Sequence, residues 1–355
     1  MINLLAMPRL KQSTLLGLIS AFLLSGCNWV LLSPSGDIAT QQKDIMLISV
    51  WLMLIVIVPV MVLTVWFAWK YRASNTEATY RPEWHHSTIL ELVIWSVPLI
   101  IIIALGAITW VSTHALDPYR PLDRISEGRD VPMDTKPLVV EVVAMDWKWL
   151  FIYPEQGIAL VNEVAAPVDR PIEFHLTSTT MMNSFFIPAL AGQIYAMPGM
   201  ETKLHAVINK AGDYAGFSGN YSGAGFSHMR FRFHGLSEAE FAEWVEKNRK
   251  DGAELTREAY LKLEQPSERE PVQRFAKVDA ALFDAVLNRC VETNRMCIKD
   301  MMAIDRKGGM GTAGTHNLAS NAMLSRKIGL DLASQKTYVG TLCAPEVQAE
   351  RSKLL

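Results

Sequence analysis

The sequence is poor in cysteine and has almost no excess of charge. Four cysteines in 355 residues, with no Cys-x-x-Cys pair, argue against a disulfide-stapled scaffold and against a zinc ribbon. Thirty-four basic and 36 acidic side chains give a net charge of −2, so no strong positive field attracts nucleic acid. Hydrophobic residues, by contrast, make up 50% of the chain. This share exceeds that of an average soluble domain, and it is concentrated in particular segments.

Residues 1–26 have the pattern of a secretory signal peptide. A basic end precedes an apolar core at residues 15–24, which is too short for a stable membrane span. The core ends in the tetrapeptide LSGC at residues 24–27, which resembles a bacterial lipobox. The pattern predicts that Cys27 carries a lipid anchor and is the first residue after cleavage. An ordinary signal peptide followed by a buried cysteine is the alternative.

Two later segments are apolar enough to cross a bilayer, which takes about 20 residues. Residues 45–69 and 92–116 contain no Asp, Glu, Lys or Arg, and we assign transmembrane helices to residues 45–69 and 89–113. Pro59 and Pro98 fall inside them, and membrane helices tolerate proline where neighbouring helices satisfy the freed carbonyls. Two buried helices of a soluble core are the alternative.

The orientation follows from export and from charge. An exported N-terminus places residues 27–44 in the periplasm, and the loop at 70–88 is then cytoplasmic. This loop holds Lys70, Arg72 and Arg81, whereas the segment before the first helix has only Lys43, so basic residues are more frequent on the inner side. The prediction is a multi-pass, lipid-anchored protein of the bacterial inner membrane, with its C-terminal part in the periplasm.

A polar linker at residues 117–136 ends where the hydrophobic period becomes two. Alternation at residues 172–176, 202–207 and 229–234 predicts strands with one buried face. Short strands separated by turns favour a β-sandwich over residues 137–250. The expected fold class is therefore a membrane-anchored all-β protein, with a two-helix transmembrane hairpin, a sandwich and a partly helical C-terminal extension.

Within residues 137–250, a helix is expected where the strands end, because Ser237 and Glu240 have the spacing of a capping box. The composition changes again at residue 265, and residues 265–355 form the C-terminal extension. An amphipathic helix is expected at about residues 278–303 within it.

The other three cysteines leave their pairing open. Cys290 and Cys297 can pair with each other in an oxidising compartment, or either can pair with Cys343. A continuous helix would hold Cys290 and Cys297 too far apart, so a bond between them requires a break in the helix.

Several motifs resemble subunit II of the haem–copper respiratory oxidases, over about residues 45–250. The order of elements, two membrane helices before an exported sandwich, is the same. The resemblance implies a cupredoxin-like sandwich. The residues that carry it are Glu91-x-x-x-Trp95-x-x-Pro98, the aromatic run 145–151, the loops 183–188 and 197–200, and the run 214–223 followed by Phe226 and Met229.

The chain departs from the copper-binding branch of that family at the metal ligands. That branch uses H-S-x-x-I-P and C-x-E-x-C-x-x-x-H-x-x-M, and its dinuclear copper centre needs two bridging thiolates. Serine hydroxyls are hard donors that cannot replace them. The resemblance therefore implies a lost copper site and no metal in this chain, with one matching ligand retained. The corresponding positions are Asn183, Ser218, Asn220, Ser222 and Phe226, with Met229 retained.

Without copper, the chain is most similar to the quinol-oxidase branch, the cytochrome bo-type ubiquinol oxidases, on the runs 147–159 and 113–116. The resemblance implies a proton-translocating respiratory-chain complex that oxidises ubiquinol and reduces O2 to water. Haem b, a high-spin haem and copper belong to its subunit I, where ubiquinol binds. This chain is expected to scaffold subunit I, beside subunits III and IV. No catalytic centre of its own and no cytochrome c partner are expected.

Glu91 is the one residue with an expected part in the chemistry. By resemblance it matches the acidic residue at the mouth of the lysine-containing proton pathway into subunit I. The other interpretation is a capping box from Thr88 to Glu91. His85 and His86 stand nearby. Histidines are common at membrane interfaces, and this is the favoured interpretation; buffering of protons is the alternative.

The remaining aromatic and imidazole side chains are given structural interpretations. Trp147, Trp149 and Tyr153 are expected to pack the domain against subunit I. The histidines of the exported domain have no metal-ligand spacing, and we expect surface or satisfied core groups; they are His175, His205, His228 and His234.

A different class of protein remains possible on the sequence alone. A free-standing membrane lipoprotein could use a degenerate cupredoxin domain to bind a ligand or a metal. An oxidase subunit would copurify with haem and a polytopic partner, whereas a free lipoprotein would not.

Overall fold

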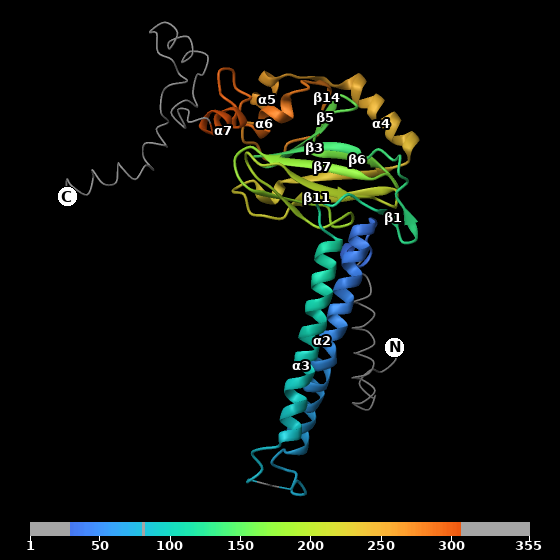
Figure 1. Cartoon of the computed structure of the whole chain (residues 1–355), viewed down its shortest axis with the longest axis vertical. Helices are drawn as coiled ribbons and strands as arrows, with labels where there is room; N and C mark the ends of the chain where they lie inside the picture. Colours follow the sequence, from blue (N-terminus) through green and yellow to red (C-terminus); the bar gives the residue numbers. More distant parts are fainter. Residues whose placement is uncertain (1–28, 80–81, 307–355) are drawn as a thin grey trace, which may run out of the picture.

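The computed structural model describes residues 29–79 and 82–306. Two long helices stand below a β-sandwich, and a layer of short helices covers the sandwich on its far side (Figure 1). The predicted signal peptide, Cys27 and Cys343 lie outside the described residues.

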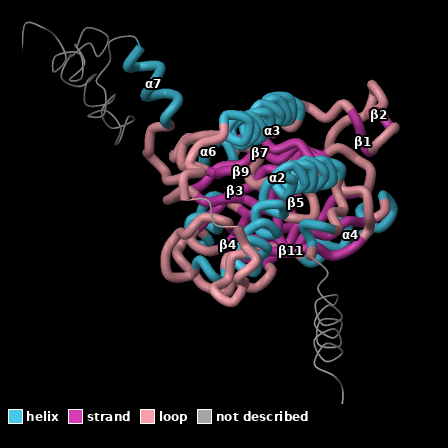
Figure 2. The backbone as a smooth tube through the Cα atoms, turned by 90° about the horizontal axis from the view of Figure 1, so that it is seen from below, coloured by secondary structure: helices cyan, strands magenta, loops and turns pink. Residues whose placement is uncertain are grey.

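The helix pair consists of α2 (Asp37–Lys70) and α3 (Thr88–Ala115), preceded by the short η2 (Val30–Leu32). Each long helix is apolar and long enough to cross a membrane, and most of its large side chains are exposed. Figure 2 shows the two helices end-on, side by side, against the strands. Apolar side chains in this number are stable only against lipid or a partner protein.

Helix α2 begins eight residues before the predicted span, which started at residue 45 (45 − 37 = 8). Its first turns are polar and rest against the sandwich. Asp37 is buried there and suits the positive end of the helix dipole. Hydropathy alone could not detect this part of the helix, because the partner of Asp37 is Arg124, far along the chain.

The sandwich consists of two sheets. The first has the strand order β10-β7-β3-β4-β5-β14-β13 and the second the order β6-β12-β11-β8-β9. A small hairpin of β1 and β2 lies within the predicted linker. The bounds are β1 Arg124–Ser126, β2 Arg129–Asp130, β3 Leu138–Met145, β4 Lys148–Tyr153, β5 Ile158–Val161, β6 Glu163–Pro167, β7 Ile172–Ser178, β8 Asn183–Phe186, β9 Ile194–Ala196, β10 Thr202–Ala206, β11 Gly212–Ser218, β12 Arg230–Leu236, β13 Ala253–Leu255 and β14 Gln273–Val278.

An aromatic cluster fills the space between the sheets. The Trp149 ring lies 5.4 Å from that of Phe185 and 5.6 Å from that of Phe231, centroid to centroid. The Tyr153 hydroxyl donates to the carbonyl of Ala165 and accepts from its amide, both at 2.8 Å. Trp149 and Tyr153 are fully buried in this core. The expectation that they pack against subunit I is therefore wrong, because neither side chain reaches the surface.

Helix α4 (Glu238–Asp251) begins as predicted. Ser237 accepts from the amide of Glu240, and the Glu240 carboxylate accepts from the amide of Ser237, which completes the capping box. Phe241 and Val245 on this helix are buried against the sandwich core.

A second core lies on the outer face of the seven-stranded sheet. Leu150 and Ile152 point outward from β4 and meet side chains that follow residue 250 in the chain. Strands β13 and β14 extend the same sheet. The sheet thus continues past the predicted end of the sandwich, because its last strands come from a segment with little periodicity. The covering elements are α5 (Arg257–Leu263), α6 (Leu282–Leu287) and α7 (Ile298–Arg306).

The single helix expected at about residues 278–303 is wrong. The chain forms the end of β14, the short α6, a loop and then α7. Arg289 takes a left-handed conformation with φ 55°, which ends the helical path. The break brings Cys290 and Cys297 together in a disulfide, with Cα atoms 4.8 Å apart. One of the pairings that the sequence left open is thereby selected.

Candidate functional site

The loops at one end of the sandwich bring together the positions that correspond to copper ligands. Asn183 opens β8, Ser218 closes β11, and Met229 directly precedes β12. Ser222 lies in the loop between β11 and η3 (Phe226–His228). These four side chains are buried, whereas Asn220 and Phe226 are half-buried. Residues far apart in the sequence therefore converge as the family resemblance predicts.

The polar atoms of this cluster satisfy one another or the backbone. The Ser218 hydroxyl lies 3.3 Å from both Oδ1 of Asn183 and the carbonyl of Asn220, so its proton can go to either. The amide nitrogen of Asn220 donates to the Met182 carbonyl at 3.2 Å. The Ser222 hydroxyl lies 4.0 Å from Sδ of Met229. The result is a neutral hydrogen-bonded network.

A dinuclear copper centre does not fit this set of donors. Two thiolates must bridge its ions, and soft sulfur ligands select copper. Here the side chains are hydroxyls, amides, a phenyl ring and one thioether, and none carries a charge. Across residues 29–79 and 82–306, no three His, Cys, Asp or Glu side chains are grouped so that they could hold a metal ion.

The indole of Trp147 packs against the loop between β11 and η3. Its Nε1 donates to the carbonyl of Ser222 at 2.9 Å. A Cβ atom at Gly225 would come within 2.5 Å of the ring, and one at Gly223 within 3.1 Å. The loop can therefore approach the indole this closely only with glycine at these positions. Trp147 packs against its own domain, in a left-handed conformation with φ 67°.

Lys148 anchors the C-terminal layer at the same end of the sandwich. Its side chain is 1% exposed, and Nζ donates to the carbonyl of Gln265 at 2.7 Å and to Oγ of Ser267 at 2.5 Å. Burial lowers the pKa of Lys148, while Glu270 and Asp146 oppose the shift. Sequence reasoning missed this group; its only signal is a lone basic residue in an aromatic run.

At the other end of the molecule, Glu91 lies in the first turn of α3. The alternative interpretation, a capping box from Thr88, is wrong, because Ser87 is the N-cap and accepts from the amide of Leu90 at 3.5 Å. Oε1 of Glu91 instead lies 2.7 Å from Nδ1 of His86. The carboxylate thus forms a pair with an imidazole.

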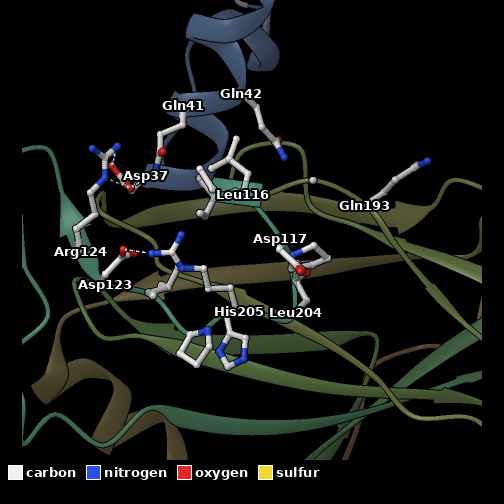
Figure 3. Close-up of a pocket in the computed structure, with 17 residues that line it drawn as sticks. Asp37, Gln41, Gln42, Leu116, Asp117, Asp123, Arg124, Gln193, Leu204 and His205 are labelled. Atoms are coloured by element: carbon white, nitrogen blue, oxygen red, sulfur yellow. Dashed lines mark hydrogen bonds and ion pairs between the residues drawn. The ribbon is translucent and has the colours of Figure 1, made fainter. Parts of the chain in front are cut away.

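The helix pair meets the sandwich at a polar junction around a cavity of about 250 Å³ (Figure 3). Asp37 is held there by two bonds from Arg124, at 2.9 and 3.2 Å, and by Nε2 of Gln41 at 2.7 Å. His205 and Asp117 also line the cavity. This junction fixes the start of α2 to the domain.

The half-buried outer face of β3, β7 and β10 carries ionisable groups. Glu201 and Glu173 lie 2.6 and 2.9 Å from the two ring nitrogens of His175. Burial, with a smaller contribution from Glu201, raises the pKa of Glu141 to about 7. Burial also lowers the pKa of His205.

The other histidines of the domain are satisfied by partners. His234 bonds to Asp213 at 2.5 Å, and His228 lies 3.1 Å from Nη2 of Arg269. The structural interpretation of the histidines is consistent with these contacts.

Two family models match parts of this chain. Residues 155–234 match the family model of the periplasmic domain of cytochrome c oxidase subunit II, and residues 249–294 match the COX aromatic rich motif. The chain is also similar to the crystal structure of the periplasmic domain of a cytochrome oxidase subunit II from Bradyrhizobium japonicum. That similarity has 25% sequence identity and a TM-score of 0.32, and it covers 34% of this chain and 100% of that one.

Two curated relatives are similar over most of their length. Cytochrome bo(3) ubiquinol oxidase subunit 2 of Pseudomonas putida is 49% identical over 281 residues, which are 79% of this chain and 87% of that protein. Its counterpart in Pseudomonas aeruginosa is 50% identical over 274 residues, 77% of this chain and 80% of that protein.

The helix pair, the cupredoxin-like sandwich and its loops define a subunit II of the haem–copper oxidases. The chain belongs to the quinol-oxidase family of these subunits, with the cytochrome bo(3) ubiquinol oxidase subunits 2 as its curated relatives. It is therefore a membrane-anchored subunit of an oxidoreductase complex, with a periplasmic domain and a partner subunit I.

Proposed function

We propose that this chain is the non-redox subunit II of a proton-translocating terminal ubiquinol oxidase. It scaffolds subunit I, which would hold haem b, a high-spin haem and copper, and which oxidises ubiquinol and reduces O2 to water. Subunits III and IV complete the complex, and no cytochrome c is needed. The observation that carries this proposal is the neutral network around Ser218, in a pocket that would need thiolates to conduct electrons.

Two features support a scaffolding role. The exposed apolar faces of α2 and α3 provide a large surface for a polytopic partner within the bilayer. The Asp37–Arg124 junction couples these helices to the sandwich, so that the sandwich is held over the periplasmic side of the partner. The proposed lipid on Cys27 would add a second anchor at the same membrane surface.

Glu91 has a proposed role in proton uptake from the cytoplasm into subunit I. Its side chain is 52% exposed at the end of α3 that the charge bias assigns to the cytoplasm. A carboxylate at that position is open to water and can exchange protons with it.

Metal analysis tests the proposal. The chain is purified in detergent without its partner subunits, incubated with copper and dialysed. We expect no stoichiometric copper and no mixed-valence absorption. A tightly bound dinuclear centre, or rapid reduction of the chain by cytochrome c, would contradict a non-redox subunit II.

A further inference from the structure

We propose that His86 is the group that takes protons from the cytoplasmic solution and delivers them to Glu91. The inference rests on the proposed role of Glu91 in proton uptake. The observation behind it is the 2.7 Å contact between Nδ1 of His86 and Oε1 of Glu91. This contact gives the carboxylate a titratable neighbour on its solvent side.

The geometry gives the imidazole two distinct sides. Nδ1 faces the carboxylate, and Nε2 faces Oγ1 of Thr88 at 3.2 Å. The side chains of His86 and Glu91 are 59% and 52% exposed, so water reaches the imidazole directly. A neutral imidazole carries one N–H and one lone pair, and it can therefore accept a proton at one nitrogen while releasing another proton at the opposite one.

The proton balance closes in each cycle. Water protonates Nε2 while Nδ1–H donates to the carboxylate, which gives an imidazolium ion. The Nδ1 proton then moves to Oε1 of Glu91, leaving a neutral imidazole and a neutral carboxylic acid. Glu91 passes this proton inward and becomes a carboxylate again. The imidazole returns to its first tautomer by exchange with water, so one proton enters for each one delivered.

Histidine suits this step because its charge changes between pH 5 and 8, whereas a free carboxylate binds protons only at lower pH. A carboxylate that depends on bulk water alone must therefore collect protons from a scarce hydronium pool at neutral pH. The adjacent imidazole of His86 adds a second group that is open to water and already contacts the carboxylate. The pair thus increases the probability that a proton is present when Glu91 needs one.

The other charged groups near this turn are engaged elsewhere in the described structure. On the facing end of α2, Nζ of Lys70 lies 4.8 Å from the Trp66 ring centroid, and Nε of Arg72 donates to Oγ of Ser74 at 2.9 Å.

In the loop itself, Nδ1 of His85 lies 2.7 Å from the backbone carbonyl of Glu83 and makes no described contact with Glu91. Neither Glu83 nor Glu77 forms an ion pair with His86 among the described residues. His86 is therefore the imidazole in contact with Glu91, and His85 provides a matched control one residue away.

The experiment uses the assembled oxidase with His86→Ala, and measures ubiquinol-driven oxygen consumption from pH 6 to pH 9. Water can still reach Glu91, so we expect a loss of about fivefold at pH 8, smaller than the full contribution of a general acid–base group. The loss should shrink towards pH 6, and added imidazole should restore the rate. His85→Ala should leave the rate, the pH profile and the imidazole response unchanged.

The outcomes separate this inference from the function it rests on. If Glu91→Gln turns over normally, proton uptake through Glu91 is wrong. If Glu91→Gln is slow but His86→Ala keeps the wild-type pH profile and ignores imidazole, only the role of His86 is overturned. Because His86 is proposed to act only through Glu91, the double variant His86→Ala/Glu91→Gln should be no slower than Glu91→Gln alone. Haem absorbance confirms assembly, and His86→Gln, which is closer in volume, replaces His86→Ala if assembly fails.

Discussion

The loops around Ser218 and the first turn of α3 around Glu91 contrast in what holds them in place. Buried side chains, a supporting indole and close-packed glycines fix the loops, and their polar groups are neutral and satisfied. The turn around Glu91 is exposed and has few contacts, but it carries two ionisable groups 2.7 Å apart. One region therefore has a defined geometry without acid–base or redox chemistry, whereas the other has the chemistry with little packing.

This contrast teaches that the loops of a copper pocket can keep their shape without the side chains that would bind the metal. The hydrogen bond from Trp147 to the Ser222 carbonyl, and the glycines above the indole, involve none of the side chains that would bind metal. A sandwich can thus keep the loops in position while the residues inside them change. Each prediction below tests one side of this contrast.

The largest expected effect is the return of copper when ligands are restored. The variant Asn183→His/Ser218→Cys/Asn220→Glu/Ser222→Cys/Phe226→His should bind copper stoichiometrically and show mixed-valence absorption, because the loops already converge. The matched control keeps both serines and changes only the other three positions; it should lack this absorption, since thiolates bridge the ions. Failure of the five-fold variant to bind copper, although folded by circular dichroism, would show that the loops do not have the required geometry.

The second prediction concerns the chemistry at α3. Glu91→Gln removes the carboxylate and keeps its shape, so oxygen reduction by the assembled complex should slow by about 100-fold, the lower range for a positioned acid–base group. Stopped-flow haem reoxidation and steady-state oxygen consumption measure the effect. Glu83→Gln, in the same loop, is the control and should turn over normally. Equal rates for Glu91→Gln and the wild type would leave Glu91 without a role in proton uptake.

Local patterns predicted much of the fold correctly. Alternation identified β7, β10 and β12, and the spacing of Ser237 and Glu240 identified the start of α4, because these signals depend only on neighbouring residues. Long-range contacts were not predictable in this way. The buried Asp37–Arg124 pair extends α2 beyond its apolar part. Tyr260 and Phe275 share a buried cluster with Leu150 and Ile152 of β4, and β14 pairs with β5, so the apparent extension is part of the sheet.

In the candidate site, too, some features could be predicted from the sequence and others could not. The family resemblance implied which residues the loops would bring together, and Ser218 lies 3.3 Å from both Oδ1 of Asn183 and the carbonyl of Asn220. Hydrogen-bond partners were harder to predict. The sequence left a capping box from Thr88 to Glu91 open as an alternative. The adjacent Ser87 takes the cap position instead, and Glu91 pairs with His86. Lys148 could not be recognised as an anchor, because its acceptors lie more than a hundred residues away in the chain.

The third prediction tests what fixes the loop geometry. Gly225→Ala places a methyl group 2.5 Å from the indole of Trp147, so the chain purified in detergent should lose about 2 kcal/mol of unfolding free energy. Urea denaturation followed by tryptophan fluorescence measures this loss. Ala224→Ser, at the exposed neighbouring position, should change little.

A double-mutant cycle tests whether the indole of Trp147 causes the destabilisation by Gly225→Ala. If the indole is the obstacle, Gly225→Ala should cost much less in a Trp147→Ala background than in the wild type. Equal costs in the two backgrounds would mean that the loop is held by something other than the indole.

The smallest expected effect comes from Glu141, one of the ionisable groups on the outer face of β3, β7 and β10. Burial raises its pKa to about 7 in the folded chain, so the folded state binds a proton that the unfolded state releases at lower pH. The unfolding free energy should therefore fall as the pH rises from about 4.5 to about 7 and then stay level. Because Glu141 is partly exposed, solvent screening limits this loss to about 1 kcal/mol.

In Glu141→Gln this loss should be absent, so the difference in stability between pH 5 and pH 8 should be smaller than in the wild type. Thermal melts at the two pH values measure it. Glu243→Gln, on the exposed face of α4, should leave the difference between the two pH values unchanged. Glu201→Gln should act in the same direction as Glu141→Gln but more weakly, since Glu201 raises the pKa of Glu141 less than burial does. A wild-type chain with no slope between pH 5 and pH 7 would mean that water reaches Glu141 freely. The outer face of β3 would then add no pH dependence to the stability of the sandwich.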